Sequence, residues 1–112
     1  MELIVQVQQW ENQTSIQHMT KDGAGFFKCY WVLDENFDRI FFSDFYVNQD
    51  KRNSGLGKQM IDSFHKFARL SGFKNSLLGA EKGSWMEAWY KRLGYEFHEE
   101  KDDNENWLIK KL

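Results

Sequence analysis

The sequence has 112 residues, of which 41% are hydrophobic and 17% aromatic, and its formal net charge at pH 7 is -2. A chain of this length can bury one hydrophobic core, so we expect a single domain over residues 1–112. The near balance of basic and acidic residues argues against the broad positive face of duplex-binding proteins, and no nucleic-acid partner is expected.

Membrane, disulfide and metal chemistry are also not indicated. No apolar run reaches the roughly 20 residues that span a bilayer, and the N-terminus does not have the pattern of a secretion signal. The single cysteine, Cys29, cannot form an intramolecular disulfide and is expected to be a buried strand residue rather than a nucleophile paired with a histidine. The histidines lack metal-ligand spacing, so no metal is predicted. We therefore expect a cytoplasmic protein.

The N-terminal half has the pattern of β-strands. Residues 2–10 are rich in β-branched side chains and predict a first strand. Residues 11–22 are polar and fit either one short helix or a loop with a strand fragment. Two aromatic-rich runs, 26–33 and 39–47, flank the turn-prone residues 34–36 and predict an antiparallel hairpin.

A strand-helix-strand unit is expected next. Apolar residues recur at helical spacing from Leu56 to Leu70, and Gly72 follows as a helix stop. Residues 76–80 are short and apolar, which indicates a buried strand. A strand reached through such a helix favours parallel pairing with the strand before it.

The C-terminal part predicts a second helix and a last hairpin. Ser84 and Glu87 form the Ser-x-x-Glu pattern of a capping box, and Gly94 ends the helix. Strands are expected at 95–98 and 106–110. The predicted fold is α/β, with a mixed, mostly antiparallel central sheet of about six to seven strands and two main helices.

The segment that joins the strand ending at Val47 to the next helix is suited to binding phosphate. Gly55 and Gly57 lie at the first turn of the helix, where unpaired N-H groups and the helix dipole favour an anion. Arg52 and Lys58 add positive charge beside them. A glycine pair at a helix start is equally a device for close packing, and the spacing alone leaves both interpretations open.

Two motifs resemble one known family. Arg52-x-x-Gly55-x-Gly57 matches the Arg/Gln-x-x-Gly-x-Gly/Ala signature of the GCN5-related N-acetyltransferases (GNAT). The segment 89–95, Trp-Tyr-Lys-Arg-Leu-Gly-Tyr, is similar to the aromatic-Tyr-x-x-x-Gly-aromatic segment of the last helix in that family. The resemblance covers roughly residues 24–112.

The resemblance implies an acetyl-CoA-dependent N-acetyltransferase that acts on a primary amine. In the family the pantetheine arm pairs with the splayed end of the fourth strand, and its pyrophosphate binds the loop after that strand. Carried over, the pantetheine positions are Phe45, Tyr46 and Val47, and the pyrophosphate positions are Arg52, Asn53, Ser54, Gly55, Leu56, Gly57 and Lys58.

The same resemblance makes Tyr90 the expected general acid, which would protonate the departing thiolate. Its alternative role is that of a packed helix tyrosine. Some members carry a glutamate that acts as the general base, and the corresponding position here is Phe41. Asp44, Glu81 or a relayed water remain open candidates for the base. Gly83 stands where members often carry an asparagine.

The acceptor side departs further from the family. Members usually place two helices between their first and second strands, and residues 11–22 leave room for at most one short helix. We expect an open acceptor side that suits a protein lysine, a protein N-terminus or a small polycationic amine, or a homodimer that supplies the missing wall.

The acidic turn 99–105 would attract such an amine, or is only a solvated hairpin tip. Trp85 and Trp89 are either acceptor-pocket residues or core packing. A protein that keeps this fold without catalysis, binding acyl-CoA or a partner protein, is the alternative function.

Overall fold

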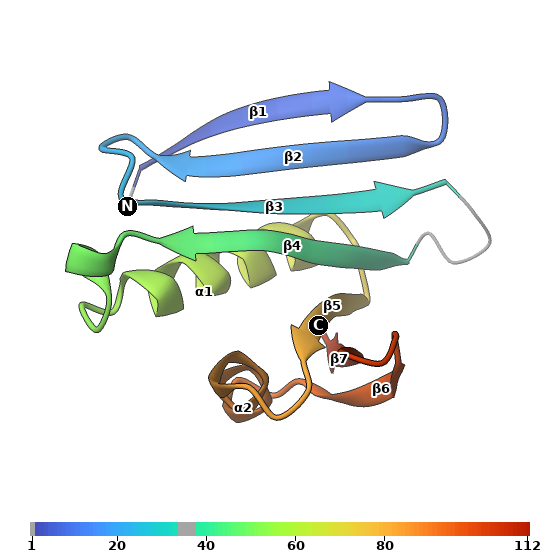
Figure 1. Ribbon diagram of the computed structural model, residues 1–112. Coiled ribbons are helices and arrows are strands. Elements are labelled where there is room, and N and C mark those ends of the chain that lie inside the picture. The colour runs from blue at the N-terminus through green and yellow to red at the C-terminus, as the bar shows by residue number, and fades with distance from the viewer. Residues whose placement is uncertain (1, 34–37) are drawn as a thin grey trace.

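A computed structural model describes residues 2–33 and 38–112 of the chain. The turn expected at residues 34–36 lies outside these residues. The strands form one seven-stranded sheet in the order β1-β2-β3-β4-β5-β7-β6, with two α-helices (Figure 1). The predicted fold class, a mixed and mostly antiparallel sheet with two main helices, is confirmed.

The first four strands form an antiparallel meander. They are β1 (Leu3–Gln9), β2 (Gln13–Thr20), β3 (Gly25–Val32) and β4 (Arg39–Val47). The ambiguous segment 11–22 therefore contains a strand over residues 13–20 and no helix. Its alternate residues Ile16, His18 and Thr20 are buried, and the strand pairs with neighbours on both sides, which satisfies its backbone in a way that one short helix could not.

Helix α1 connects β4 to β5 through a parallel crossover. A short 3-10 turn at Gln49–Lys51 precedes α1 (Leu56–Leu70), and β5 (Asn75–Glu81) returns parallel to β4, as predicted. Gly72 has φ +90° and permits the backbone reversal that ends the helix, after which the Phe73 N-H donates to the Ala68 carbonyl.

The last elements are α2 (Trp85–Arg92), β6 (Glu96–Glu100) and β7 (Glu105–Lys111). Ser84 is the N-cap of α2 and accepts a hydrogen bond from the Glu87 N-H at 3.1 Å, so the predicted cap is present. The Glu87 carboxylate reaches back to the N-H of Gly83 rather than to that of Ser84.

Both helices pack on the same face of the sheet. The ring of Phe42 in β4 lies 4.7 Å from that of Phe64 in α1 and 6.4 Å from that of Tyr90 in α2, as centroid distances. One core of apolar side chains joins these helices to the central strands. Among the described residues, no helix is long and apolar enough to cross a membrane.

Candidate active site

Strands β4 and β5 pair only at their beginnings and then separate. Their register runs from Arg39 opposite Asn75 to Phe41 opposite Leu77 and ends there. Beyond Phe41, the β4 edge that faces β5 has no strand partner. On the other side of β4, the register with β3 shifts opposite Asp44, which has φ +45°, so the strand carries a β-bulge at this point. Unpaired strand N-H and C=O groups are thereby available to a ligand.

A cavity of about 280 Å³ opens where the two strands separate. It is lined by residues of β4, β5, α2 and the start of β7: Phe42, Ser43, Asp44, Phe45, Leu78, Gly79, Ala80, Glu81, Ser84, Met86, Tyr90 and Glu105. A larger hollow of about 520 Å³ lies at the opposite end of β3 and β4, and none of the predicted site residues lines it. The smaller cavity is thus the one that matches the predicted chemistry.

Tyr90 is packed as a helix tyrosine and also lines the cavity. Its ring is in contact with Phe42, Trp89 and Tyr95, and its side chain is 6% exposed. It also lines the cavity, and its hydroxyl has no hydrogen-bond partner among the described residues. Burial raises the pKa of this phenol, so it is protonated at neutral pH and able to donate.

The start of α1 presents free N-H groups. Gly55 is the N-cap with φ +88° and offers no side-chain acceptor. The first helical carbonyl bond runs from the Gln59 N-H to the Gly55 oxygen, and no acceptor among the described residues takes the N-H groups of residues 56–58. Uncapped donors at the positive end of a helix are suited to an anion.

The predicted charges of this loop are turned toward the protein itself. The Arg52 Nε donates to the Val47 carbonyl at 3.0 Å, and its guanidinium lies over the Tyr46 ring at 5.9 Å. Lys58 forms an ion pair with Asp62 one turn later, at 2.6 Å. The Ser54 hydroxyl donates to the Lys51 carbonyl instead of capping the helix. An arriving diphosphate would compete with these contacts.

Glycine is required at the two loop positions for different structural reasons. Gly55 needs its positive φ, while an added Cβ there would meet nothing within 4 Å. Gly57 lies against β4, because a Cβ would come 3.4 Å from the Phe45 ring and 3.8 Å from Val47. The packing interpretation therefore holds for Gly57, and the small residue also keeps the first turn open to a ligand.

The predicted pantetheine positions lie on the part of β4 that has no partner on the β5 side, while Tyr46 and Val47 still pair with β3 on the other side. Phe45 faces the helices and stacks on Trp89 at 5.9 Å, which assigns Trp89 to packing. Tyr46 faces the other side, is 45% exposed and lies against Phe26. Val47 is half-buried. Trp85 is 66% exposed and stacks on Trp89, and neither tryptophan lines the cavity.

Candidate bases differ in their placement. Asp44 and Glu81 both line the cavity, and Asp44 also lies 3.7 Å from the Lys28 ammonium. Phe41 does not line it, and its ring stacks on Tyr30 at 4.8 Å on the helix-free face of the sheet. Gly83 adopts φ +72° in the turn before α2, a conformation that an asparagine would take less readily than glycine.

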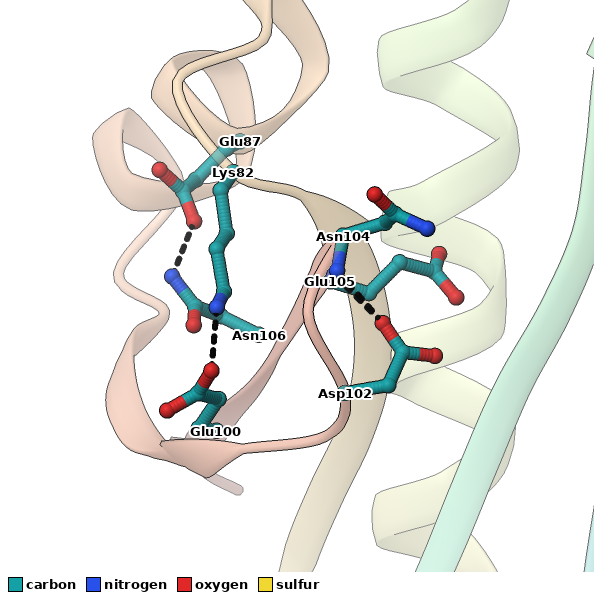
Figure 2. A network of polar contacts seen from close by, with 7 residues as sticks. All are labelled: Lys82, Glu87, Glu100, Asp102, Asn104, Glu105 and Asn106. Atoms are coloured by element: carbon teal, nitrogen blue, oxygen red, sulfur yellow. Dashed lines mark hydrogen bonds and ion pairs between the residues drawn. The ribbon is translucent and has the colours of Figure 1, made fainter.

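The turns around the cavity are tied together by polar contacts (Figure 2). The Asn106 amide donates to Glu87 at 2.9 Å, and the Lys82 ammonium pairs with Glu100. Asp102 accepts hydrogen bonds from the N-H groups of residues 104 and 105. The contacts of Glu100 and Asp102 pair part of the negative charge of the acidic turn within the protein. The pKa of Glu87 is lowered, first by the hydrogen bond from Asn106 and then by the hydrogen bond from the Gly83 N-H.

One cluster at the cavity was missed by sequence reasoning. Lys101 in the turn after β6 folds over the sheet toward Trp107 and Glu105 of β7. Glu105 belongs to the acidic turn 99–105, which was the available signal. Neither Lys101 nor Trp107 has a motif, because the contact depends on how the turn folds back.

Cys29 and the buried histidines lie in the core and do not line the cavity. Cys29 is fully buried, and burial raises the pKa of its thiol to about 12. His18 stacks on Phe27, and His65 lies 2.9 Å from the Tyr95 hydroxyl, so neither faces the thiol as a base. No group of three or more His, Cys, Asp or Glu that could hold a metal ion occurs among residues 2–33 and 38–112.

Comparison with known proteins bears on both sequence and fold. The sequence profile of the acetyltransferase (GNAT) domain matches residues 12–97. A search of curated proteins finds no match.

Three solved structures illustrate the similarity in fold. The PaiA N-acetyltransferase of Thermoplasma acidophilum, in complex with coenzyme A, has a TM-score of 0.71 at 13% identity, over 90% of this chain and 62% of that chain. An acetyltransferase from Thermus thermophilus has a TM-score of 0.73 at 15% identity, over 91% and 66%. A GNAT family acetyltransferase from Elizabethkingia anophelis with acetyl-CoA bound has a TM-score of 0.72 at 12% identity, over 98% of both chains. The chain thus spans less than two thirds of the first two and nearly all of the third.

Proposed function

The chain belongs to the acetyltransferase (GNAT) family, and from this premise we propose that it transfers an acetyl group from acetyl-CoA to a primary amine. The observation that carries the proposal is the cavity between β4 and β5, with the Tyr90 side chain in its wall and the uncapped start of α1 after the same β4 strand. Strand β4 therefore has the proposed acid beside its cavity, and the proposed anion site follows it along the chain.

The donor is acetyl-CoA in this proposal. Its pyrophosphate binds the N-H groups of the loop from Arg52 to Lys58, and its pantetheine amides pair with the free β4 edge at Phe45, Tyr46 and Val47. Support comes from the unpaired N-H groups of residues 56–58 and from the end of β4–β5 pairing at Phe41. Two proteins of similar fold were solved with coenzyme A or acetyl-CoA bound.

The acceptor amine attacks the thioester carbon directly, and the C–S bond breaks as the new C–N bond forms. Tyr90 donates its proton to the departing thiolate, since its raised pKa keeps the phenol protonated. An alkylammonium of pKa about 10.4 must lose a proton at a cost of about 4 to 5 kcal/mol at pH 7. Asp44 and Glu81 line the cavity, as Glu105 does, and they are the candidate bases for that proton.

The second candidate function is a protein that binds acyl-CoA or a partner without catalysis. It is favoured by the absence of a glutamate at Phe41 and of an asparagine at Gly83. The two functions share the phosphate loop and differ in turnover. They are therefore separated by measuring binding and thiol release on the same protein.

The test is acetyl-CoA binding by calorimetry, followed by release of free CoA thiol in the presence of primary amines. We expect binding and release, and we expect Gly57→Glu to abolish binding because it places a carboxylate at the anion site. The matched control is Gln8→Glu on β1, which adds the same charge at an exposed position far along the sheet. Binding without thiol release would favour the second function. Binding that Gly57→Glu leaves unchanged, in a variant shown to be folded by circular dichroism, would remove both.

A further inference from the structure

The Lys101 ammonium sits in a site that is built for a cation. Its Nζ lies 4.8 Å from the centre of the Trp107 ring and 3.3 Å from the Glu105 Oε1. An aromatic face and a carboxylate are the two groups that recognise an alkylammonium ion in proteins. The side chain of Lys101 is 36% exposed, so it reaches this position from a solvent-facing turn.

Gly79 of β5 supplies the floor of the same site. A Cβ built on Gly79 would lie 3.2 Å from the Lys101 Nζ, 3.4 Å from its Cδ and 3.7 Å from the Glu105 Oε2. The absence of a side chain therefore lets the ammonium lie against the strand. Both Gly79 and Glu105 line the cavity between β4 and β5, which puts the lysine at its rim.

The site opens on the face of the sheet that the helices leave free. A row of aromatic rings crosses this face, with Tyr30 stacked on Phe41 at 4.8 Å and Phe41 against Trp107 at 5.6 Å. If an amine acceptor approaches from this side, its apolar stem would contact the row of aromatic rings. Its charged ammonium group would lie where the Lys101 ammonium lies now. Phe41, which gives the strand no carboxylate here, contributes a hydrophobic surface instead.

We propose that Trp107, Glu105 and the bare backbone at Gly79 form the ammonium subsite of the acceptor, and that Lys101 fills it until a substrate displaces it. The inference rests on the proposed function and narrows the acceptor to an amine that arrives as an alkylammonium with an extended apolar stem. The lysine acts as an internal competitor. It shields the aromatic face and the carboxylate when no substrate is present, and it swings out into solvent when one arrives.

The experiment follows binding and turnover of cadaverine, a diamine with a five-carbon stem. Binding is read from the backbone amide resonance of Gly79 by nuclear magnetic resonance, which needs no turnover. Turnover is read from CoA thiol release at saturating acetyl-CoA. Pentanol serves as the neutral analogue and is expected to leave the resonance unchanged.

Removal of the competitor is the first variant. Lys101→Met is expected to lower both the dissociation constant and the KM for cadaverine by about fivefold, the effect of one cation–π contact and one partly exposed ion pair. Lys111→Met removes the same charge from an exposed position on the same strand as Trp107 and is expected to change neither. Acetyl-CoA affinity should stay constant in both variants.

Removal of the subsite is the second. In the Lys101→Met background, Trp107→Leu and Glu105→Gln are each expected to weaken cadaverine binding by about threefold or more. The subsite proposal is wrong if cadaverine does not shift the Gly79 resonance in the Lys101→Met variant. It is also wrong if Lys101→Met and Lys111→Met change the dissociation constant and the KM for cadaverine equally.

The two proposals fail in different ways. If the protein releases thiol and neither Lys101→Met nor Glu105→Gln changes the KM for cadaverine, the proposed activity stands and the proposed subsite is wrong. If cadaverine shifts the Gly79 amide resonance but no thiol is released, the proposed subsite stands and the proposed activity is wrong.

Discussion

At the scale of single residues, Tyr90 is both packed in the core and placed in the wall of the cavity, where we propose that it acts as the general acid. Three aromatic neighbours hold its ring, so replacement of the hydroxyl alone leaves that packing in place. The residue lines the cavity, and its hydroxyl has no hydrogen-bond partner among the described residues, so loss of the hydroxyl should cost folding little.

Tyr90→Phe is therefore expected to separate catalysis from stability. We expect the rate of thiol release to fall by about 100-fold, the contribution of a positioned general acid. The melting temperature and the acetyl-CoA dissociation constant should stay close to those of the native protein. Steady-state kinetics, calorimetry and thermal unfolding measure the three quantities. Full activity of the phenylalanine variant would show that another group protonates the thiolate.

A second residue, His65, couples stability to pH. It is 5% exposed, and burial lowers its pKa from 6.5 to about 4, with the positive charges of Lys110 and Arg69 acting in the same direction. As the pH falls below about 6.5 the unfolded chain takes up this proton before the folded one. Stability is thus lost between about pH 6.5 and pH 4, and we expect about 2 kcal/mol from this residue by pH 5.

Urea unfolding at pH 7 and pH 5 measures this loss. His65→Gln should make the two free energies of unfolding more similar, although His18, whose pKa is also lowered by burial, keeps part of the dependence. The control is His98→Gln at an exposed position of β6, which should retain the loss seen in the native protein. A His65→Gln variant that loses as much stability as the native protein would contradict this account.

At the scale of elements, the start of α2 is a local structure with its own stability. Ser84 accepts from the Glu87 N-H at 3.1 Å, and its hydroxyl donates to the Glu81 carbonyl at 2.7 Å. Ser84→Ala removes both bonds and is expected to cost about 1 kcal/mol of unfolding free energy. Urea denaturation measures it.

The same substitution inside α1 is the matched control for that prediction. Ser63 has no capping role, and alanine is the better helix former, so Ser63→Ala should be neutral or slightly stabilising. Equal losses at the two positions would mean that the cap contributes nothing specific.

Elements with local signals were predictable from the sequence, and one without them was not. The capping pattern at Ser84, the glycine after α1 and the apolar periodicity of α1 each act within a few residues, so they identify the helices. Strand β2 is different, because Ile16 and Met19 lie three apart, as on a helix. In the sheet they point to opposite faces, and only pairing with β1 and β3 decides between the two structures.

The site was predictable in the same uneven way. The phosphate loop and Tyr90 have motifs that fix residue types at short spacing. The bulge at Asp44 and the contact of Lys101 with Trp107 depend on register and on the path of a turn, which are settled by tertiary pairing. Motifs therefore predict individual residues on the proposed cofactor side, and no motif addresses the acceptor side.

At the scale of the whole molecule, the sheet consists of two parts with a weak seam. Strands β1 to β4 pair along most of their lengths, and β5, β7 and β6 do likewise, whereas β4 and β5 share three paired positions. Helix α1 and the common core hold the two parts together below the seam. In Figure 1 strands β4 and β5 run apart beyond their short paired stretch. The cavity is lined by residues of both strands.

A cofactor that fills this seam should stabilise the whole molecule and protect one part of it locally. At a CoA concentration 100 times its dissociation constant, the free energy of unfolding should rise by about 2.7 kcal/mol, since only the folded chain binds. Amide hydrogen exchange should slow most at residues 42–47 and 53–58, where the N-H groups gain partners.

Exchange in β1 and β2 is the internal reference for this prediction. These strands lie at the far edge of the sheet and touch no part of the proposed groove, so locally exchanging amides there should be unaffected by CoA. The Gly57→Glu variant should show neither the global stabilisation nor the local protection. Stabilisation with uniform protection, or protection confined to β1 and β2, would place the ligand away from the seam between β4 and β5.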